Sequence, residues 1–111
     1  MQKREVITLC GSSRFKTTFH QVNERLTLQG KIVISMGVWG HFLSEEEQAA
    51  KFSPEVKENL DRLHFDKIDM SDSIYVVNVG GYIGFSTGRE IDYAKEQGKK
   101  IYYLEAASDE K

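Results

Sequence analysis

The residues best suited to chemistry lie in a glycine-rich stretch, NVGGYIGFSTGRE, which spans residues 78–90 and ends on a single glutamate. Glycine lets backbone N–H groups approach a ligand, because no Cβ stands in the way. A carboxylate in the first turn of a helix is held ionised by the partial positive charge of the helix N-terminus. Such a carboxylate, when partly desolvated, is a usable nucleophile toward the anomeric carbon of a sugar. Glu90 is therefore a candidate nucleophile beside a small-molecule site.

Glu90 also fits a purely structural role. Thr87 to Glu90 has the form Thr-x-x-Glu, which is a capping box that satisfies the first N–H groups of a helix. On spacing alone, the capping box is the favoured interpretation. Arg89 and Asp92 fall on other faces of the same helix, and we expect them to be solvated.

A second loop of similar character, CGSSR, covers residues 10–14 and follows the first apolar segment. Its glycine and hydroxyl groups, next to the start of a helix, favour a phosphate or a carboxylate. We expect Gly11, Ser12, Ser13 and Arg14 to bind an anion, and turn and cap chemistry by the two serines is the alternative. Neither glycine-rich loop matches a dinucleotide fingerprint or a P-loop.

Cys10 is the only cysteine, which excludes an internal disulfide and a site with several thiolates. We expect it to be a small buried residue at a strand end, beside the candidate ligand loop. A metal site is not predicted, because His20, His41 and His64 have no recognisable ligand spacing. No cofactor is predicted either.

Hydrophobic patterning predicts the elements that position these loops. Short apolar runs rich in β-branched residues predict strands at 5–10, 31–36, 73–79 and 99–105. Apolar residues at steps of three and four predict helices at 13–29, 54–70 and 87–98. Pro54 suits the first position of a helix capped by Ser53, and the long connection 37–53 has room for a helical turn.

Alternation of strands and helices predicts right-handed crossovers and a parallel sheet covered on both faces. The expected fold is α/β, a flavodoxin-like or Rossmann-like three-layer sandwich with a four- to five-stranded parallel sheet. Ligands bind such sheets at the carboxyl ends of the strands. Besides Cys10 and the loop after it, the candidate ligand contacts at that edge are His41, Asn78, Gly80, Gly81, Tyr82, Gly84, Ser86 and Thr87.

Length and composition narrow the possible functions. The 111 residues, 40% of them apolar, suffice for one compact domain, residues 1–111, and are too few for two. A net charge of -2 from 15 basic and 17 acidic residues spread along the chain disfavours a nucleic acid polymer or a membrane as partner. No apolar run approaches a membrane span or a signal peptide, so we expect a cytoplasmic protein.

Three segments, LCGSSRF, SDSIYVVNV and STGREIDYAKEQGKKIYYL, resemble the nucleoside 2-deoxyribosyltransferase superfamily, which includes the small deoxynucleoside 5'-monophosphate N-glycosidases. The resemblance spans most of the chain, and its most specific part is the last segment, where the family tends to show a Gly-x-x-Glu-x-x-Tyr-Ala-x-x-x-Gly-Lys type of pattern. It implies a flavodoxin-like fold. It also implies that a glutamate takes the deoxyribosyl group, and by position this glutamate is Glu90.

The position of the proton donor departs from that family. The family often has an aspartate eight residues before the aspartate that opens the third strand, and His64 stands there, with Asp61 one turn earlier. The helix runs antiparallel to the strand and rises about 1.5 Å per residue, which places Asp69 and Asp72 near the opposite end of the sheet. We expect His64 or Asp61 to be the donor, with a half-buried, packed histidine as the alternative for His64.

A second departure is Gly84, six residues before Glu90, where transferases of the family can carry an aspartate that orients the base or sugar. Ser86 or Asn78 are the candidate substitutes. The resemblance further implies that Tyr82 or Trp39 stacks on the base, and these rings fit the role of hydrophobic lids or subunit contacts equally well.

The implied reaction is cleavage or transfer at the N-glycosidic bond of a (deoxy)nucleoside or its 5'-monophosphate. Glu90 would attack or stabilise the anomeric carbon, while His64 or Asp61 helps to protonate the departing base. Arg14, with the two serines before it, would hold a 5'-phosphate.

Two alternatives remain open. The segments CGSS and GGYIGFSTGRE also resemble the cytokinin-activating phosphoribohydrolases, and a non-catalytic nucleotide-binding or sensing module can have the same fold. In each case the partner is a small nucleoside or nucleotide. A homodimer is expected, because cyclic dimers are the commonest assemblies of such small chains.

Overall fold

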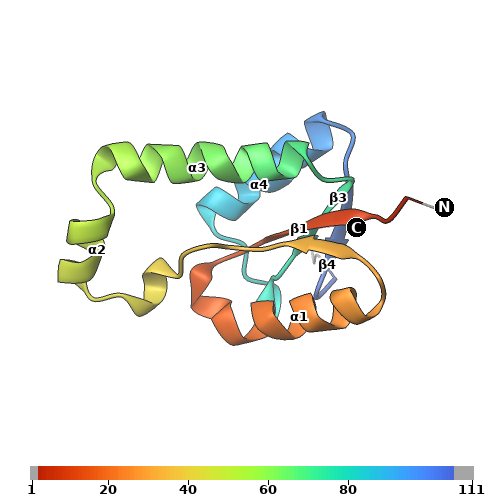
Figure 1. Cartoon of the computed structure of the whole chain (residues 1–111), viewed down its shortest axis with the longest axis horizontal. Helices are drawn as coiled ribbons and strands as arrows, with labels where there is room; N and C mark the ends of the chain where they lie inside the picture. Colours follow the sequence, from red (N-terminus) through yellow and green to blue (C-terminus); the bar gives the residue numbers. More distant parts are fainter. Residues whose placement is uncertain (1–2, 107–111) are drawn as a thin grey trace.

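A computed structural model describes residues 3–106. Its centre is a parallel sheet in the order β2-β1-β3-β4 (Figure 1). The strands are β1 (Val6–Cys10), β2 (Ile32–Ile34), β3 (Ser73–Val76) and β4 (Lys100–Tyr103). The predicted α/β class and the parallel sheet are confirmed, with four strands in the described part of the chain.

Helices cover both faces of this sheet, which gives three layers. The helices are α1 (Lys16–Leu28), α2 (Glu45–Lys51), α3 (Pro54–Asp69) and α4 (Phe85–Glu96). Figure 1 shows α1 on one side of the sheet and α3 and α4 on the other, with α2 extending beyond the sheet. Within residues 3–106, no helix has the length and apolar character of a membrane span.

The core has two parts because successive side chains of a strand point to opposite faces. The part under α1 contains Ile7, Leu9, Phe19, Val22, Leu26, Tyr75 and Val77. The part under α3 and α4 contains Cys10, Ile68, Ile74, Val76, Ile91 and Ala94. The central strands β1 and β3 are buried on both faces, as their continuous apolar sequences predict, whereas the edge strands β2 and β4 are partly exposed.

Serine side chains cap the turn before α1, which was the alternative expected for Ser12, and the start of α3, as predicted for Ser53. Ser12 accepts a hydrogen bond from the Arg14 N–H (3.2 Å) at a 3₁₀ turn (Ser13–Phe15) that leads into α1. Ser53 caps α3, in which Pro54 is the first residue. The connection 37–53 is more ordered than predicted, since it contains a 3₁₀ turn (Gly40–Phe42) and α2.

The start of α4 corrects the sequence-based interpretation. The helix begins at Phe85, and Gly84 occupies the cap position with an extended backbone. Thr87 is therefore the third residue inside the helix and is buried. The capping box predicted for Thr87 and Glu90 is wrong, because Glu90 lies in the second turn and is too far from the helix start.

The two aspartates excluded as proton donors lie where the geometric argument places them. The Asp72 carboxylate accepts a hydrogen bond from the N–H of Val6, the first residue of β1 (2.8 Å). Asp69, the last residue of α3, accepts from the Tyr93 hydroxyl (2.6 Å). Asp72 therefore marks the amino end of the sheet, which leaves the opposite edge for ligands.

Gly11 is the position at which this carboxyl edge requires glycine. Its φ is +155°, and a Cβ there would lie 2.9 Å from the Val77 carbonyl oxygen and 3.2 Å from the Phe19 ring. We expect Gly11→Ala to lower the free energy of unfolding by about 1–3 kcal/mol through backbone strain and overpacking.

Gly88 provides the matched control, because it lies inside α4 and a Cβ there meets nothing within 4 Å. Gly88→Ala should raise the free energy of unfolding by about 0.5–1 kcal/mol, since alanine is the better helix former. Urea unfolding of both variants measures the two effects. Equal stability of the two variants would contradict the proposed role of Gly11.

Candidate active site

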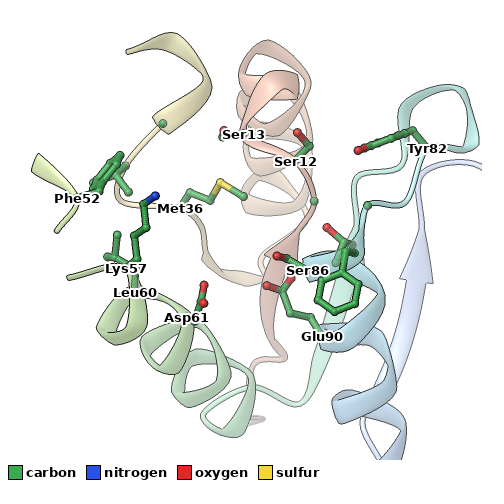
Figure 2. A pocket seen from close by; sticks show the side chains of 16 residues that line it. Ser12, Ser13, Met36, Phe52, Lys57, Leu60, Asp61, Tyr82, Ser86 and Glu90 are labelled. Atoms are coloured by element: carbon green, nitrogen blue, oxygen red, sulfur yellow. The ribbon is translucent and has the colours of Figure 1, made fainter. Parts of the chain in front are cut away.

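A cavity of about 500 Å³ opens at the carboxyl ends of the strands (Figure 2). The loops after β1, β2 and β3 all contribute to its wall, and so does the first half of α3. The predicted site residues that line it are Gly11, Ser12, Ser13, Asp61, Tyr82, Gly84, Ser86, Thr87 and Glu90. The structure thus brings together most of the residues selected from two distant glycine-rich loops.

Glu90 forms part of the cavity wall. Figure 2 shows its carboxylate beside Ser86, with Asp61 of α3 facing it across the cavity. The Glu90 side chain is 16% exposed, and its Oε1 lies 3.4 Å from His64 Nε2. The carboxylate therefore faces another helix and an open space, and it does not fold back onto the start of α4.

Burial is the main influence on the pKa of Glu90. Desolvation raises the pKa of Glu90 to about 7, a hydrogen bond from the Cys10 thiol opposes this rise, and the charge of Asp61 adds to it. The expectation that the helix N-terminus keeps Glu90 ionised is wrong, because the field acts on the first turn and Glu90 lies in the second. Glu90 therefore titrates near neutral pH, where the protonated and the ionised form are both present.

His64 lies behind Glu90, away from the main cavity. Desolvation lowers the pKa of His64 to about 4, the charge of Lys67 lowers it further, and the charge of Asp61 opposes the shift. His64 is therefore neutral at pH 7. The contact between His64 and Glu90 is therefore not an ion pair between two charged groups. His64, Asp61 and Glu90 also line a smaller adjoining cavity of about 260 Å³.

Cys10 completes the group behind the cavity. It is fully buried at the end of β1, as expected, and its Sγ lies 3.3 Å from His64 Nε2. Burial and the negative charge of Glu90 raise the pKa of the Cys10 thiol well above its ordinary value. Cys10 does not line the cavity, and it acts on the site only through Glu90 and His64.

Arg14 and His41 lie outside the cavity. Arg14 is exposed, and its guanidinium group lies 4.5 Å from the centre of the Tyr82 ring and donates to the Ser12 hydroxyl. His41 is exposed, and its backbone N–H donates to the Ser13 hydroxyl (3.0 Å). Both residues therefore hold cavity residues in place without lining the cavity themselves.

Asn78, Gly80 and Gly81 shape the loop after β3 instead of lining the cavity. Asn78 is buried, and its side-chain amide donates to the Glu105 carbonyl (2.9 Å) and accepts from the Glu105 N–H (3.0 Å). Gly80 and Gly81 have positive φ angles of +65° and +81°, a conformation that favours glycine. Of the two substitutes for the missing family aspartate, only Ser86 lines the cavity.

Lys57 is the main functional candidate that sequence reasoning missed. It is the one cationic side chain among the described residues that line the cavity. It lies in the first turn of α3, four residues before Asp61, so both side chains occupy one face of the helix. The four-residue spacing from Asp61 could have identified Lys57 from the sequence. The other wall residues not predicted are Met36, Val38, Gly40, Phe52, Leu60 and Phe85.

Among the described residues, one cluster brings together three side chains of types that can bind a metal ion. The ligand atoms of Cys10, His64 and Glu90 lie within 4.8 Å of one another. His20 and His41 take no part in that group, so the histidine spacing in the sequence had no bearing on it.

Neither the protein-family models nor the curated protein sequences compared with this chain match it. The site combines a carboxyl group that titrates near neutrality, a second acid across the cavity, hydroxyl groups and one lysine. Such a set suits acid-base or nucleophilic chemistry on a small polar molecule.

Proposed function

We propose that the protein cleaves or transfers at the N-glycosidic bond of a (deoxy)nucleoside or its 5'-monophosphate, with Glu90 as nucleophile. The observation that supports this most is the Glu90 carboxyl group on the wall of a cavity of about 500 Å³. Small-molecule sites typically measure about 300–1,000 Å³, so a nucleotide is of suitable size. The family resemblance of the sequence points to the same bond.

The proposed step breaks the bond between the anomeric carbon and the base nitrogen. The electron pair leaves with the base, which takes up a proton from Asp61 or from water, and a Glu90 oxygen bonds to or stabilises the oxocarbenium-like carbon. Water or a second base then displaces the glutamate. A Glu90 pKa of about 7 leaves a substantial ionised fraction at neutral pH.

Asp61 is the better placed partner for the departing base. It lines the main cavity, whereas His64 does not. His64 instead contacts Glu90 (3.4 Å), which suits a positioning residue that exchanges a proton with the nucleophile. We therefore assign contact with the base to Asp61 and orientation of Glu90 to His64.

A panel assay tests the proposal. The protein is incubated with nucleosides, deoxynucleosides and their 5'-monophosphates, with and without an acceptor base, in the presence of a chelator. Release of free base is measured by chromatography. We expect release from at least one class of substrate, and a new nucleoside on addition of acceptor identifies a transferase. If no substrate is cleaved, the enzymatic proposal is wrong, and a non-catalytic nucleotide-binding module becomes the favoured function.

Lys57 should favour phosphorylated substrates. A hydrogen bond to a charged group contributes about 1.5–3 kcal/mol, and Lys57 is exposed, so we take the lower end. Lys57→Ala should weaken binding of a 5'-monophosphate about tenfold and binding of the matching nucleoside little. Calorimetric Kd values measure this, with Lys51→Ala at the exposed end of α2 as control. Equal losses for both ligands would exclude a phosphate contact.

The rim of the cavity suggests a second copy of the chain as partner. Tyr82, Phe85 and Val38 line the cavity and are 43%, 82% and 44% exposed, so a partner that covers the rim would remove their apolar surface from water. We propose a homodimer that covers them. Sedimentation should show a dimer that Phe85→Ser weakens, and a monomer at all concentrations would refute it. The cytoplasmic location stays a prediction.

A further inference from the structure

The group behind the cavity has the composition of a transition-metal site. Sulfur, imidazole nitrogen and carboxylate oxygen are the three donor types that Zn²⁺ accepts in proteins. Mg²⁺ and Ca²⁺ require oxygen ligands, so a cysteine and a histidine select against both. We propose that Cys10 Sγ, His64 Nε2 and a Glu90 carboxylate oxygen bind a Zn²⁺-like cation whose fourth position faces the cavity.

The distances between these atoms suit a single ion. Around tetrahedral Zn²⁺, bonds of about 2.3 Å to sulfur and about 2.0 Å to nitrogen and oxygen place the ligand atoms roughly 3.3–3.6 Å apart. Cys10 Sγ lies 3.3 Å from His64 Nε2, and that nitrogen lies 3.4 Å from Glu90 Oε1. The third pair lies within 4.8 Å. Only small side-chain adjustments are needed to bind the ion.

Charge and access also favour the cation. A buried thiolate or carboxylate alone is costly, but a thiolate and a carboxylate together cancel the two charges of Zn²⁺. The thiol proton, and the Glu90 proton where present, leave to solvent on binding. Glu90 lines both cavities, which gives the ion a route from solvent, while Cys10 lies fully buried behind Glu90 and His64.

Binding is tested without any substrate, so its failure and the failure of the proposed function are distinguishable. Co²⁺ is titrated into the full, chelator-treated chain. Because Cys10 is the only cysteine, a thiolate-to-Co²⁺ absorption band can arise only from this site. We expect one equivalent of Co²⁺ to produce the band and Zn²⁺ to displace it. Absence of the band in the wild type would overturn the proposal.

Variants locate the site. Cys10→Ser should abolish the band, and His64→Gln should weaken Zn²⁺ binding by at least the roughly 100-fold that loss of an outer-shell partner can cost. Circular dichroism reports whether each variant folds, and His64→Gln is decisive if the serine variant does not. His20→Gln, at an exposed histidine, is the control for surface binding. Unchanged Zn²⁺ affinity in His64→Gln would overturn the proposal.

The consequence for activity rests on the proposed function. A cation on Glu90 occupies the lone pairs that would attack the sugar, so Zn²⁺ should inhibit base release, and a chelator should restore it.

Discussion

Replacing Glu90 by glutamine is expected to lower the rate of base release at least about 10³-fold, as the loss of a nucleophile does in other enzymes. Glutamine has the shape of glutamate and can occupy the same place beside His64, but its neutral amide neither forms a glycosyl ester nor stabilises a positive anomeric carbon. The cavity remains open, so binding of the nucleotide should persist. Single-turnover rates and Kd values of the two proteins measure the separate effects.

Asp92 offers a matched control on the same helix. It is exposed and does not line the cavity, so Asp92→Asn removes the same charge at a distance from the substrate. We expect Asp92→Asn to cleave at the wild-type rate. Cleavage by Glu90→Gln at that rate as well would exclude Glu90 as the nucleophile.

The same Glu90→Gln variant should be more stable than the wild type at alkaline pH. Burial raises the pKa of Glu90 from 4.5 to about 7, so the folded state favours the protonated form. The wild type therefore loses stability as the pH rises from 4.5 through 7. A pKa shift of this size corresponds to a loss of about 3 kcal/mol in the free energy of unfolding. Glutamine mimics the protonated acid at every pH, so the variant avoids this loss.

His64 contributes with the opposite sign. Its pKa falls from 6.5 to about 4 on folding, so its contribution is present above pH 6.5 and is lost as the pH falls through 4. In the wild type the two groups oppose each other between pH 4.5 and 6.5, and stability should change little there. In Glu90→Gln only the His64 contribution remains, and stability should rise with pH over this range.

Urea unfolding of both proteins between pH 4 and 8.5, with a chelator present, measures these curves. We expect the variant to be more stable by about 3 kcal/mol at pH 8.5 and nearly equal to the wild type at pH 4. Parallel curves across the whole range would show that Glu90 has an ordinary pKa. The stabilisation of a variant that loses activity is typical of functional carboxylates.

Local sequence patterns predicted the helices and strands well. An element that is buried on one or both faces has apolar residues at a characteristic spacing, and that spacing is visible within a short segment of sequence. The boundaries are less accurate. The strand expected at 31–36 pairs with β1 only over Ile32–Ile34, although β1 itself continues to Cys10. At α4, the cap position is occupied by Gly84 and not by Thr87. Thr87 lies inside the helix, where its side chain is buried in the core.

The sequence by itself determined the α/β fold, the parallel sheet and the edge at which the glycine-rich loops meet, since these follow from periodicity and from the handedness of crossovers. Only the tertiary structure decided which side chains surround Glu90. Cys10 and His64 are 54 positions apart, and no spacing links them to each other or to Glu90. The burial of Cys10, His64 and Glu90 shifts the pKa of each group. The free-energy cost of a buried charge depends on the residues that exclude water from it, and these residues are far apart in the sequence.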